Sequence, residues 1–255
     1  MSLSIAIVGL PNVGKSTLFN ALTNNNILAA NYPFATIEPN SGVVPIPDPR
    51  LDQLAKLYNS KKIVPATVEF TDVAGLVAGA SKGEGLGNQF LSHIRECAAI
   101  VQVVRDFKDN NVIHVDNQLN AKKDIETINT ELVLADLQTI EKVLPRLAKE
   151  ARANPKTKPQ ADLAEKLKEH LNDNRPIYND ASLLNQTNEL LKDLQLLTAK
   201  PIIYLFNVSE EVLTSEQKQQ ELANVVAPNS ALFVNAKLED ELRSLDQNER
   251  SEMLA

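Results

Sequence analysis

Residues 9–17 read Gly9-Leu-Pro-Asn-Val-Gly-Lys-Ser-Thr17 and match the phosphate-loop pattern G-x-x-x-x-G-K-[ST]. The apolar run Ser4–Val8 directly before them predicts a buried strand, and Lys15–Thr23 has the character of a helix. In this order the backbone N–H groups of the loop and the positive end of the helix dipole face one anion. The stretch therefore predicts a site for nucleotide phosphates, with a chance match as the alternative.

Four other segments predict the remaining strands of a sheet, namely Thr67–Thr71, Ala98–Val104, Ile202–Phe206 and Ala231–Val234. Segments of helical pattern separate the strands along the chain, which favours parallel strands joined by right-handed crossovers. We expect the Ras-like α/β fold of a P-loop NTPase, with a mainly parallel sheet and helices on both faces.

The middle of the chain has the periodicity of long helices. From about Ile125 to Lys149 apolar residues recur every three or four positions, and Pro145 is expected to kink this helix. A break is predicted over Ala153–Gln160. Two further helical stretches follow it, one through Leu163, Leu167 and Leu171 and one over Leu183–Leu197.

The mixed charges of these helical stretches favour a projecting antiparallel hairpin, a coiled-coil arm, over a helical layer packed on the sheet. We therefore expect residues 129–199 to be a helical coiled-coil insertion. It would interrupt a nucleotide-binding domain made of residues 1–128 and 200–255.

The composition excludes several classes of protein. Hydrophobic residues make up 43% of the chain, enough for a globular core, and no run approaches the roughly 18 apolar residues of a membrane-spanning helix. The start of the chain lacks the basic residues of a signal peptide, and a single cysteine, Cys97, excludes a disulfide framework. The net charge of −7 gives no support to DNA binding. We expect a cytoplasmic protein with neither a membrane nor DNA as its partner.

All eight glycines lie in the first 87 residues. Glycine permits left-handed backbone and the close approach of other groups, so the special backbone chemistry is expected in this part of the chain. Beyond the phosphate loop, Gly75 closes the sequence Asp72-Val-Ala-Gly75 at the end of a predicted strand. The glycine-rich segment Gly79–Gly87 is expected to be a switch whose order depends on the γ-phosphate.

The phosphate loop and the Asp72-to-Gly75 sequence together predict a metal–phosphate site, because the carboxyl ends of parallel strands meet at one edge of a sheet. We expect Lys15 to reach the β- and γ-phosphates, and Ser16 and Asp72 to hold Mg²⁺. The N–H of Gly75 is expected to meet the γ-phosphate. Thr36, between the two motifs, is expected to be a further Mg²⁺ ligand, with a surface threonine as the alternative.

The sequence Asn207-Val208-Ser209-Glu210 follows a predicted strand at the place where GTPases commonly carry N-K-x-D. The lysine is missing and the acid is one methylene longer. Adenine has neither the N1 proton nor the 2-amino group that a close-set aspartate reads in guanine. The change therefore favours relaxed or adenine-directed selectivity, with a mere cap of the next helix by Glu210 as the alternative. Asn235-Ala236-Lys237 follows the last predicted strand and is expected to contact the base mainly through its backbone.

The first 87 residues, above all residues 72–95 with their run of glycines, resemble the Obg class of P-loop NTPases. The N-x-x-E element, Asn-Thr-Glu-Leu at 129–132 and Leu-Thr-Ala-Lys-Pro at 197–201 are similar to the Obg-like ATPase (YchF) family over essentially the whole chain. The resemblance implies an ATP-preferring NTPase domain interrupted by a coiled-coil arm, and the ribosome as partner. A TGS domain normally follows in that family, and this chain ends at Met253-Leu-Ala255, about where it would begin.

The resemblance also implies individual roles. Phe107 matches a family residue near adenine, with a core phenylalanine as the alternative, and Asn12 matches an asparagine that supports a monovalent cation, here K⁺, in related NTPases. Leu76 stands where Ras-type enzymes have the glutamine that orients water, so hydrolysis is expected to be slow. His114 resembles the family histidine proposed to replace that glutamine, with a structural or surface role as the alternative.

The sequence thus predicts a switch that binds ATP with Mg²⁺, hydrolyses it slowly to ADP and phosphate, and regulates a ribosome-associated process. An Obg-type GTPase and a binding module that signals by nucleotide occupancy, with negligible hydrolysis, are the two alternatives. The expected catalytic residues are Lys15, Gly75 and His114, and the expected Mg²⁺ ligands are Ser16, Thr36 and Asp72. The expected nucleotide contacts are Asn12, Val13, Gly14, Lys15, Ser16, Thr17, Phe107, Asn207, Val208, Glu210, Asn235, Ala236 and Lys237.

Overall fold

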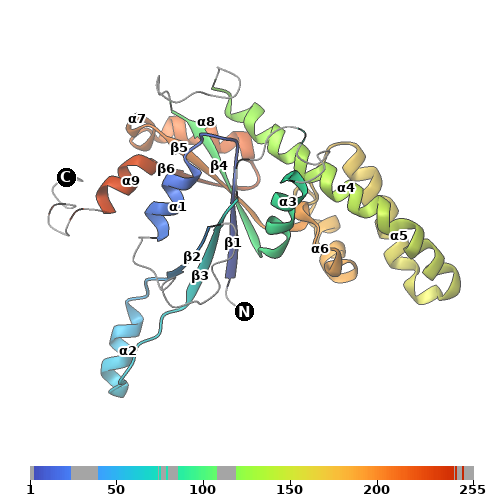
Figure 1. Cartoon of the computed structure of the whole chain (residues 1–255), viewed down its shortest axis with the longest axis horizontal. Coiled ribbons are helices and arrows are strands. Elements are labelled where there is room, and N and C mark those ends of the chain that lie inside the picture. Colours follow the sequence, from blue (N-terminus) through green and yellow to red (C-terminus); the bar gives the residue numbers. More distant parts are fainter. Residues whose placement is uncertain are drawn as a thin grey trace.

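The structure is a computed structural model that describes residues 3–23, 40–73, 75, 79, 86–107, 119–243, 245 and 249. Within these ranges the chain forms a six-stranded sheet in the order β2-β3-β1-β4-β5-β6 (Figure 1). The strands are β1 Leu3–Val8, β2 Ser41–Pro45, β3 Thr67–Asp72, β4 Ala99–Asp106, β5 Ile202–Val208 and β6 Ser230–Val234.

The pairing of the strands confirms the mainly parallel sheet. β1 pairs in parallel with β3 and β4, β4 pairs in parallel with β5, and β5 with β6. Ala6, Ile7 and Val8 are fully or almost fully buried, as expected for a central strand covered on both faces. The antiparallel edge strand β2 was not predicted, because a glycine and a proline interrupt its apolar pattern.

Helices cover both faces of the sheet, as predicted. The α-helices are α1 Lys15–Thr23, α2 Arg50–Tyr58, α3 Leu86–Glu96, α4 Ala121–Ala153, α5 Lys158–Asn172, α6 Ala181–Leu190, α7 Glu210–Leu213, α8 Glu216–Val226 and α9 Ala236–Arg243. α1 and α9 lie side by side on one face, whereas α3 and the first part of α4 lie on the other (Figure 1). α2 projects away from the sheet and buries no residue, and it was not predicted although Leu51, Leu54 and Tyr58 recur on it at helical spacing.

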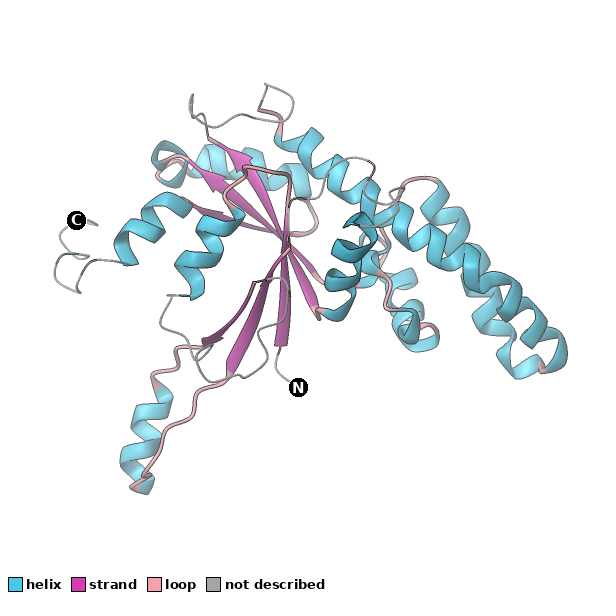
Figure 2. Cartoon of the chain, viewed as in Figure 1, coloured by secondary structure: helices cyan, strands magenta, loops and turns pink. Residues whose placement is uncertain are grey.

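The long helix α4 and helix α5 form a hairpin that extends well beyond the sheet (Figure 2). α4 runs for 33 residues and continues through Pro145. The break before α5 is shorter than predicted, because Pro159 lies in the first turn of α5, where the missing N–H of proline is tolerated. The predicted third helix ends at Leu190 and gives way to short 3₁₀ turns, with Gln195 in a left-handed conformation.

The hairpin has an apolar core of its own. Ile140 and Leu147 of α4 belong to one buried cluster with Leu163, Leu167 and Leu171 of α5. The start of α4 belongs instead to the core around the sheet, which it enters with residues such as Ile125, Ile128, Leu132 and Ala135. Because α4 takes part in both clusters, the division of the chain at residues 128 and 199 stays a prediction. None of the described helices is both long enough and apolar enough to cross a bilayer.

Candidate functional site

The phosphate loop connects the buried end of β1 to the start of α1 through a backbone that needs glycine. Gly14 has a φ of +96°, and a Cβ at this position would collide with Nδ2 of Asn207. Asn12 is also left-handed, with a φ of 63°, in a turn that asparagine tolerates better than most residues do. The left-handed backbone at Asn12 and Gly14 therefore allows the short loop to connect β1 to α1, as the sequence pattern predicts.

Lys15 points back over the loop from the first turn of α1. Its Nζ donates hydrogen bonds to the carbonyl oxygens of Gly9 at 3.2 Å and Leu10 at 2.8 Å. The residue is 7% exposed, and this burial lowers the pKa of its ammonium group, while the nearby carboxyl of Asp72 raises it. A cation is thus held at the mouth of the loop, where phosphate oxygens are expected.

Ser16 and Asp72 meet beside this lysine. The parallel register pairs Asp72 at the end of β3 with Ile7 of β1, and Oγ of Ser16 donates to Oδ2 of Asp72 at 3.0 Å. Oδ1 of Asp72 is buried and has no hydrogen-bond partner within the described ranges. Burial raises the pKa of Asp72, whereas the Ser16 hydrogen bond and Lys15 lower it. A hydroxyl and a carboxylate with an unsatisfied oxygen fit the ligands that Mg²⁺ takes in such sites.

Gly75 lies against the phosphate loop. A Cβ added to Gly75 would be only 3.0 Å from the backbone nitrogen and Cγ of Pro11, so a side chain at this position requires the loop to move. The N–H of Gly75 therefore belongs to the neighbourhood that the sequence predicted for the γ-phosphate. Thr36, Leu76 and His114 lie outside the described residues, and so does most of the predicted switch Gly79–Gly87.

A cavity of about 660 Å³ opens next to the phosphate loop, within the usual size range of small-molecule sites. Ten of the predicted nucleotide contacts line it: Asn12, Gly14, Thr17, Phe107, Asn207, Val208, Glu210, Asn235, Ala236 and Lys237. Ser209 and Glu211 also line it, which the sequence did not single out. The structure therefore brings together segments of the chain that are almost two hundred residues apart.

Asn207 joins the two halves of this cavity. Its Nδ2 donates to the carbonyl of Val13 at 3.0 Å, and its Oδ1 accepts from the N–H of Ala236 at 3.0 Å. Both atoms of the buried amide are thus engaged with backbone, so Asn207 shapes the cavity, while its second N–H and second lone pair stay available to a ligand. Asn235 similarly accepts from the N–H of Leu238 at the start of α9 and lines the cavity, and its expected backbone contact with the base stays a prediction.

Glu210 is the first residue of α7, and its exposed side chain borders the cavity. This position is compatible with a base contact and with an interaction at the helix N-terminus, so both interpretations of Glu210 stay open. Lys237 is exposed and lies 3.8 Å from the carboxylate of Glu241. Glu210 and Lys237 thus place one negative and one positive side chain at the edge of the cavity.

Phe107 forms part of the cavity wall and contacts a buried arginine, Arg105, that sequence reasoning missed. The guanidinium carbon of Arg105 lies 4.5 Å from the centroid of the Phe107 ring, and Nε of Arg105 donates to the Phe107 carbonyl at 3.2 Å. Such a cation–π contact fixes the plane of the ring. The signal in the sequence was a basic residue near the end of the otherwise apolar strand β4. Because Phe107 borders the cavity, the structure favours a ligand-facing position over a purely core one.

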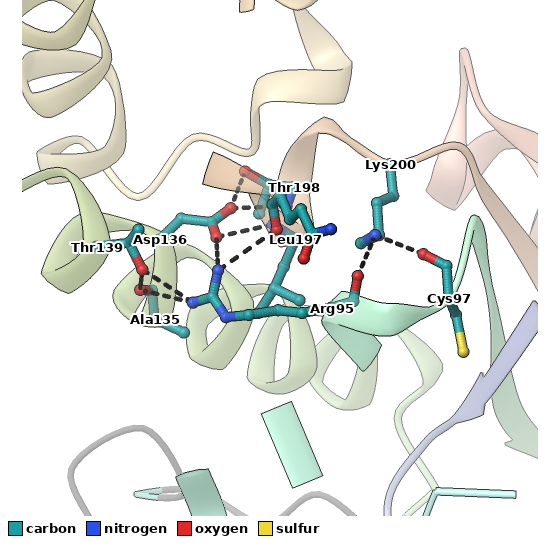
Figure 3. Close-up of polar contacts among 9 residues, drawn as sticks. Arg95, Cys97, Ala135, Asp136, Thr139, Leu197, Thr198 and Lys200 are labelled. Atoms are coloured by element: carbon teal, nitrogen blue, oxygen red, sulfur yellow. Dashed lines mark hydrogen bonds and ion pairs between the residues drawn. The ribbon is translucent and has the colours of Figure 1, made fainter. Parts of the chain in front are cut away.

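A second polar network lies behind the site, at the base of the arm (Figure 3). The buried carboxylate of Asp136 on α4 accepts from the N–H groups of Leu197 at 2.8 Å and Thr198 at 2.7 Å, and from Oγ1 of Thr198 at 2.8 Å. Arg95 of α3 lies 3.8 Å from the same carboxylate. Lys200 donates to the carbonyls of Arg95 and Cys97 at the end of α3. The segment 197–200 and α3 are thereby fastened to the arm helix.

The sheet order, the phosphate loop and the Ser16–Asp72 pair define the class of this protein as a P-loop NTPase. Comparison with known proteins agrees, because residues 4–143 match the family model described as "50S ribosome-binding GTPase". The chain is 46% identical over 260 residues to the protein of Bacillus subtilis (strain 168) named "Ribosome-binding ATPase YchF", and covers 71% of that relative. It is 47% identical over 257 residues to the protein of the same name from Escherichia coli O157:H7, of which it covers 70%.

A solved structure gives the same result. The structure described as "Structure of the Schizosaccharomyces pombe YchF GTPase" superposes with a TM-score of 0.77 at 36% identity, over 99% of this chain and 70% of that one. The chain belongs to the YchF family.

Proposed function

We propose that the protein is a cytoplasmic switch that binds ATP with Mg²⁺, hydrolyses it slowly to ADP and phosphate, and regulates a process on the ribosome. The observation that carries the proposal is the pairing of Ser16 with Asp72 next to the buried ammonium of Lys15. The name "Ribosome-binding ATPase" of the bacterial relatives supports both the nucleotide and the partner.

The residues of this chain suggest how the phosphates are handled. The ammonium of Lys15 exchanges the carbonyls of Gly9 and Leu10 for oxygens of the β- and γ-phosphates, and the N–H groups of the loop surround the same oxygens. Mg²⁺ held by Ser16, Thr36 and Asp72 would neutralise the charge that develops on the transferred group. The N–H of Gly75 approaches the γ-phosphate from the side of Pro11.

The attacking water has to be oriented without a glutamine. Leu76 carries no hydrogen-bonding side chain, so we propose His114 for this role. We also propose that Asn12 supports a K⁺ ion beside the phosphates, which would add positive charge where an arginine finger acts in other NTPases. Single-turnover hydrolysis with and without K⁺ and ribosomes tests the K⁺ site and whether the chain cleaves ATP. Absence of cleavage under every condition would leave the occupancy-signalling module as the function.

The proposal for adenine rests on the acid at position 210. We expect the base contacts to come from Phe107, Glu210 and the backbone of residues 235–237, together with Val208 and the second N–H of the Asn207 amide. A GTPase is the second candidate, because the matching family model and the fission yeast structure are both described with GTPase in their names. Competition between ATP and GTP for the same site decides the question, and tighter binding of GTP would refute adenine selectivity.

A further inference from the structure

The arm helix contacts the backbone that follows the Asp72-to-Gly75 sequence. Oε1 of Glu131 on α4 accepts a hydrogen bond from the N–H of Gly79 at 2.6 Å, across 52 residues of sequence. Glu131 is only 5% exposed, so this is a charged acceptor in a desolvated place, where a hydrogen bond to a carboxylate is strong. Glu131 of α4 therefore contacts the chain four residues after Gly75.

Gly79 is tied to the phosphate loop through a short piece of chain. Gly75 packs against Pro11 of the loop, and Gly79 follows four residues later. Four residues span at most about 14 Å when fully extended. The position of the Gly79 N–H therefore limits where the backbone of Gly75 can lie relative to the phosphate loop.

Glu131 is held firmly on its own side of the contact. Two residues earlier on α4, the amide of Asn129 bonds to the hydroxyls of Tyr204 at 3.3 Å and Tyr178 at 3.0 Å. Five residues later, Asp136 accepts the three hydrogen bonds from Leu197 and Thr198 (Figure 3). The part of α4 that carries Glu131 is thus fastened to strand β5 and to the segment before it.

Helix α3, which follows the glycine-rich segment, contacts the same face of α4. Nη2 of Arg95 donates to Oγ1 of Thr139 at 2.9 Å and to the carbonyl of Ala135 at 3.3 Å (Figure 3). Glu131, Ala135 and Thr139 are spaced four residues apart, which places them on one side of a helix. One stripe of α4 therefore holds the chain both at Gly79 and at Arg95.

We propose that Glu131 is a positioning residue for nucleotide hydrolysis. It fixes the N–H of Gly79 and thereby keeps the N–H of Gly75 in place against the phosphate loop, so that the base of the arm belongs to the hydrolytic apparatus. Displacement of a catalytic group by about 1 Å can cost on the order of 100-fold in rate, which is enough for a remote anchor to matter. This inference rests on the proposed function as an ATP hydrolase.

Three substitutions at one position test the proposal in the full chain. Glu131→Ala removes the acceptor, and Glu131→Asp withdraws the carboxylate by one methylene while keeping its charge. Glu131→Gln keeps an acceptor oxygen at the original reach. We expect kcat to fall about 10- to 100-fold in the Ala and Asp variants and less than about threefold in the Gln variant, with the Kd for ATP unchanged in all three. Glu141→Ala, at an exposed position on the same helix, is the matched control and should leave kcat unchanged.

Amide hydrogen exchange supplies a second readout that does not depend on turnover. A peptide containing Gly79 should exchange faster in Glu131→Ala and Glu131→Asp than in the parent chain, and the Gln variant should retain the protection. A normal kcat in the Ala and Asp variants together with lost protection would overturn the positioning role, and unchanged protection would overturn the contact itself. If the parent chain cleaves no ATP, the proposed function fails. The inference is then judged by whether a non-hydrolysable ATP analogue increases protection at Gly79 only when Glu131 is present.

Discussion

The side-chain amide of Asn207 donates to the carbonyl of Val13 at 3.0 Å and so connects the end of β5 to the phosphate loop. The same amide accepts from the N–H of Ala236. Asn207 consequently connects the base cavity to the phosphate loop through buried hydrogen bonds. Its amide also lies so close to Gly14 that a Cβ at position 14 would collide with it.

We expect Asn207→Ala to lower both stability and nucleotide affinity. The substitution leaves the carbonyl of Val13 and the N–H of Ala236 without their partner, and a buried polar group without a hydrogen bond costs about 1–3 kcal/mol. The free energy of unfolding in urea should therefore fall by at least about 2 kcal/mol. Asn120→Ala, which removes the N-cap of α4 at a residue that does not line the cavity, serves as the control. It should cost about 1 kcal/mol of stability and no nucleotide affinity.

Replacement of Lys15 separates phosphate binding from base binding. Lys15→Ala should weaken ATP binding by about 10- to 100-fold, the loss expected for a hydrogen bond between charged groups, and should leave adenosine binding unchanged. Isothermal titration with the two ligands measures this difference. The substitution removes a cation that burial disfavours and also leaves the carbonyls of Gly9 and Leu10 without their donor, so its two effects on the free energy of unfolding oppose each other. Equal affinity of parent and variant for ATP would contradict the placement of the phosphates.

Asp72→Asn should abolish the effect of Mg²⁺ on ATP affinity without lowering the free energy of unfolding. Burial raises the pKa of Asp72, so the ionised carboxyl is held against a desolvation cost that the neutral amide does not bear. Without Mg²⁺ we expect the variant to be as stable as the parent or more stable. The enhancement of ATP affinity by added Mg²⁺ should be lost, because one anionic ligand is missing. A variant that still responds to Mg²⁺ like the parent would show that the metal binds elsewhere.

Base selectivity is tested at two neighbouring acids. Glu210 and Glu211 both line the cavity from the start of α7, which makes Glu211→Ala a matched control for Glu210→Ala. If Glu210 contacts adenine, its removal should lower ATP affinity several-fold, by about 1 kcal/mol, and leave GTP affinity unchanged. An equal effect of both substitutions on ATP and GTP would support the simpler role of Glu210 at the helix N-terminus.

Features that depend on residues close together in the sequence were predicted best. The phosphate loop is specified by consecutive residues, and the strand ends that carry Asp72 and Asn207 follow from apolar runs, so fold and cavity could be predicted together. The antiparallel strand β2 was missed because a glycine and a proline interrupt its short apolar pattern. The exposed helix α2 was missed although Leu51, Leu54 and Tyr58 recur on it at helical spacing.

Contacts that depend on tertiary packing left little trace in the sequence. The interaction of Glu131 with Gly79, across 52 residues of sequence, could be found only once the packing of α4 against this backbone was known. Asn-Thr-Glu-Leu at 129–132 and Leu-Thr-Ala-Lys-Pro at 197–201 were noticed as family features without a physical reason. The structure supplies one for each segment. In the first, Asn129 bonds to the hydroxyls of Tyr204 and Tyr178 and Glu131 accepts from the N–H of Gly79. In the second, Thr198 donates to Asp136 of α4.

Asp136 should make the free energy of unfolding fall as the pH rises, whereas an aspartate whose pKa is lowered by an ion pair makes it increase. Its burial raises the pKa to about 6, although two backbone N–H groups, the Thr198 hydroxyl and Arg95 all oppose this change. Between the pKa of an unfolded aspartate, about 4, and that of the folded chain, the unfolded state binds fewer protons than the folded state. The contribution of Asp136 to the free energy of unfolding therefore decreases as the pH rises through this window, and is constant above it.

The measurement compares the parent chain with Asp136→Asn, which cannot titrate. From pH 5 to pH 7.5 the parent should lose about 1 kcal/mol more stability in urea unfolding than the variant does. The substitution also changes stability at every pH, because an amide N–H₂ then faces the N–H groups of Leu197 and Thr198, so only the difference in slope is informative. Parallel pH profiles would show that the carboxylate remains ionised throughout, with the hydrogen bonds and Arg95 outweighing burial. A steeper loss in the parent would show that desolvation dominates at the base of the arm.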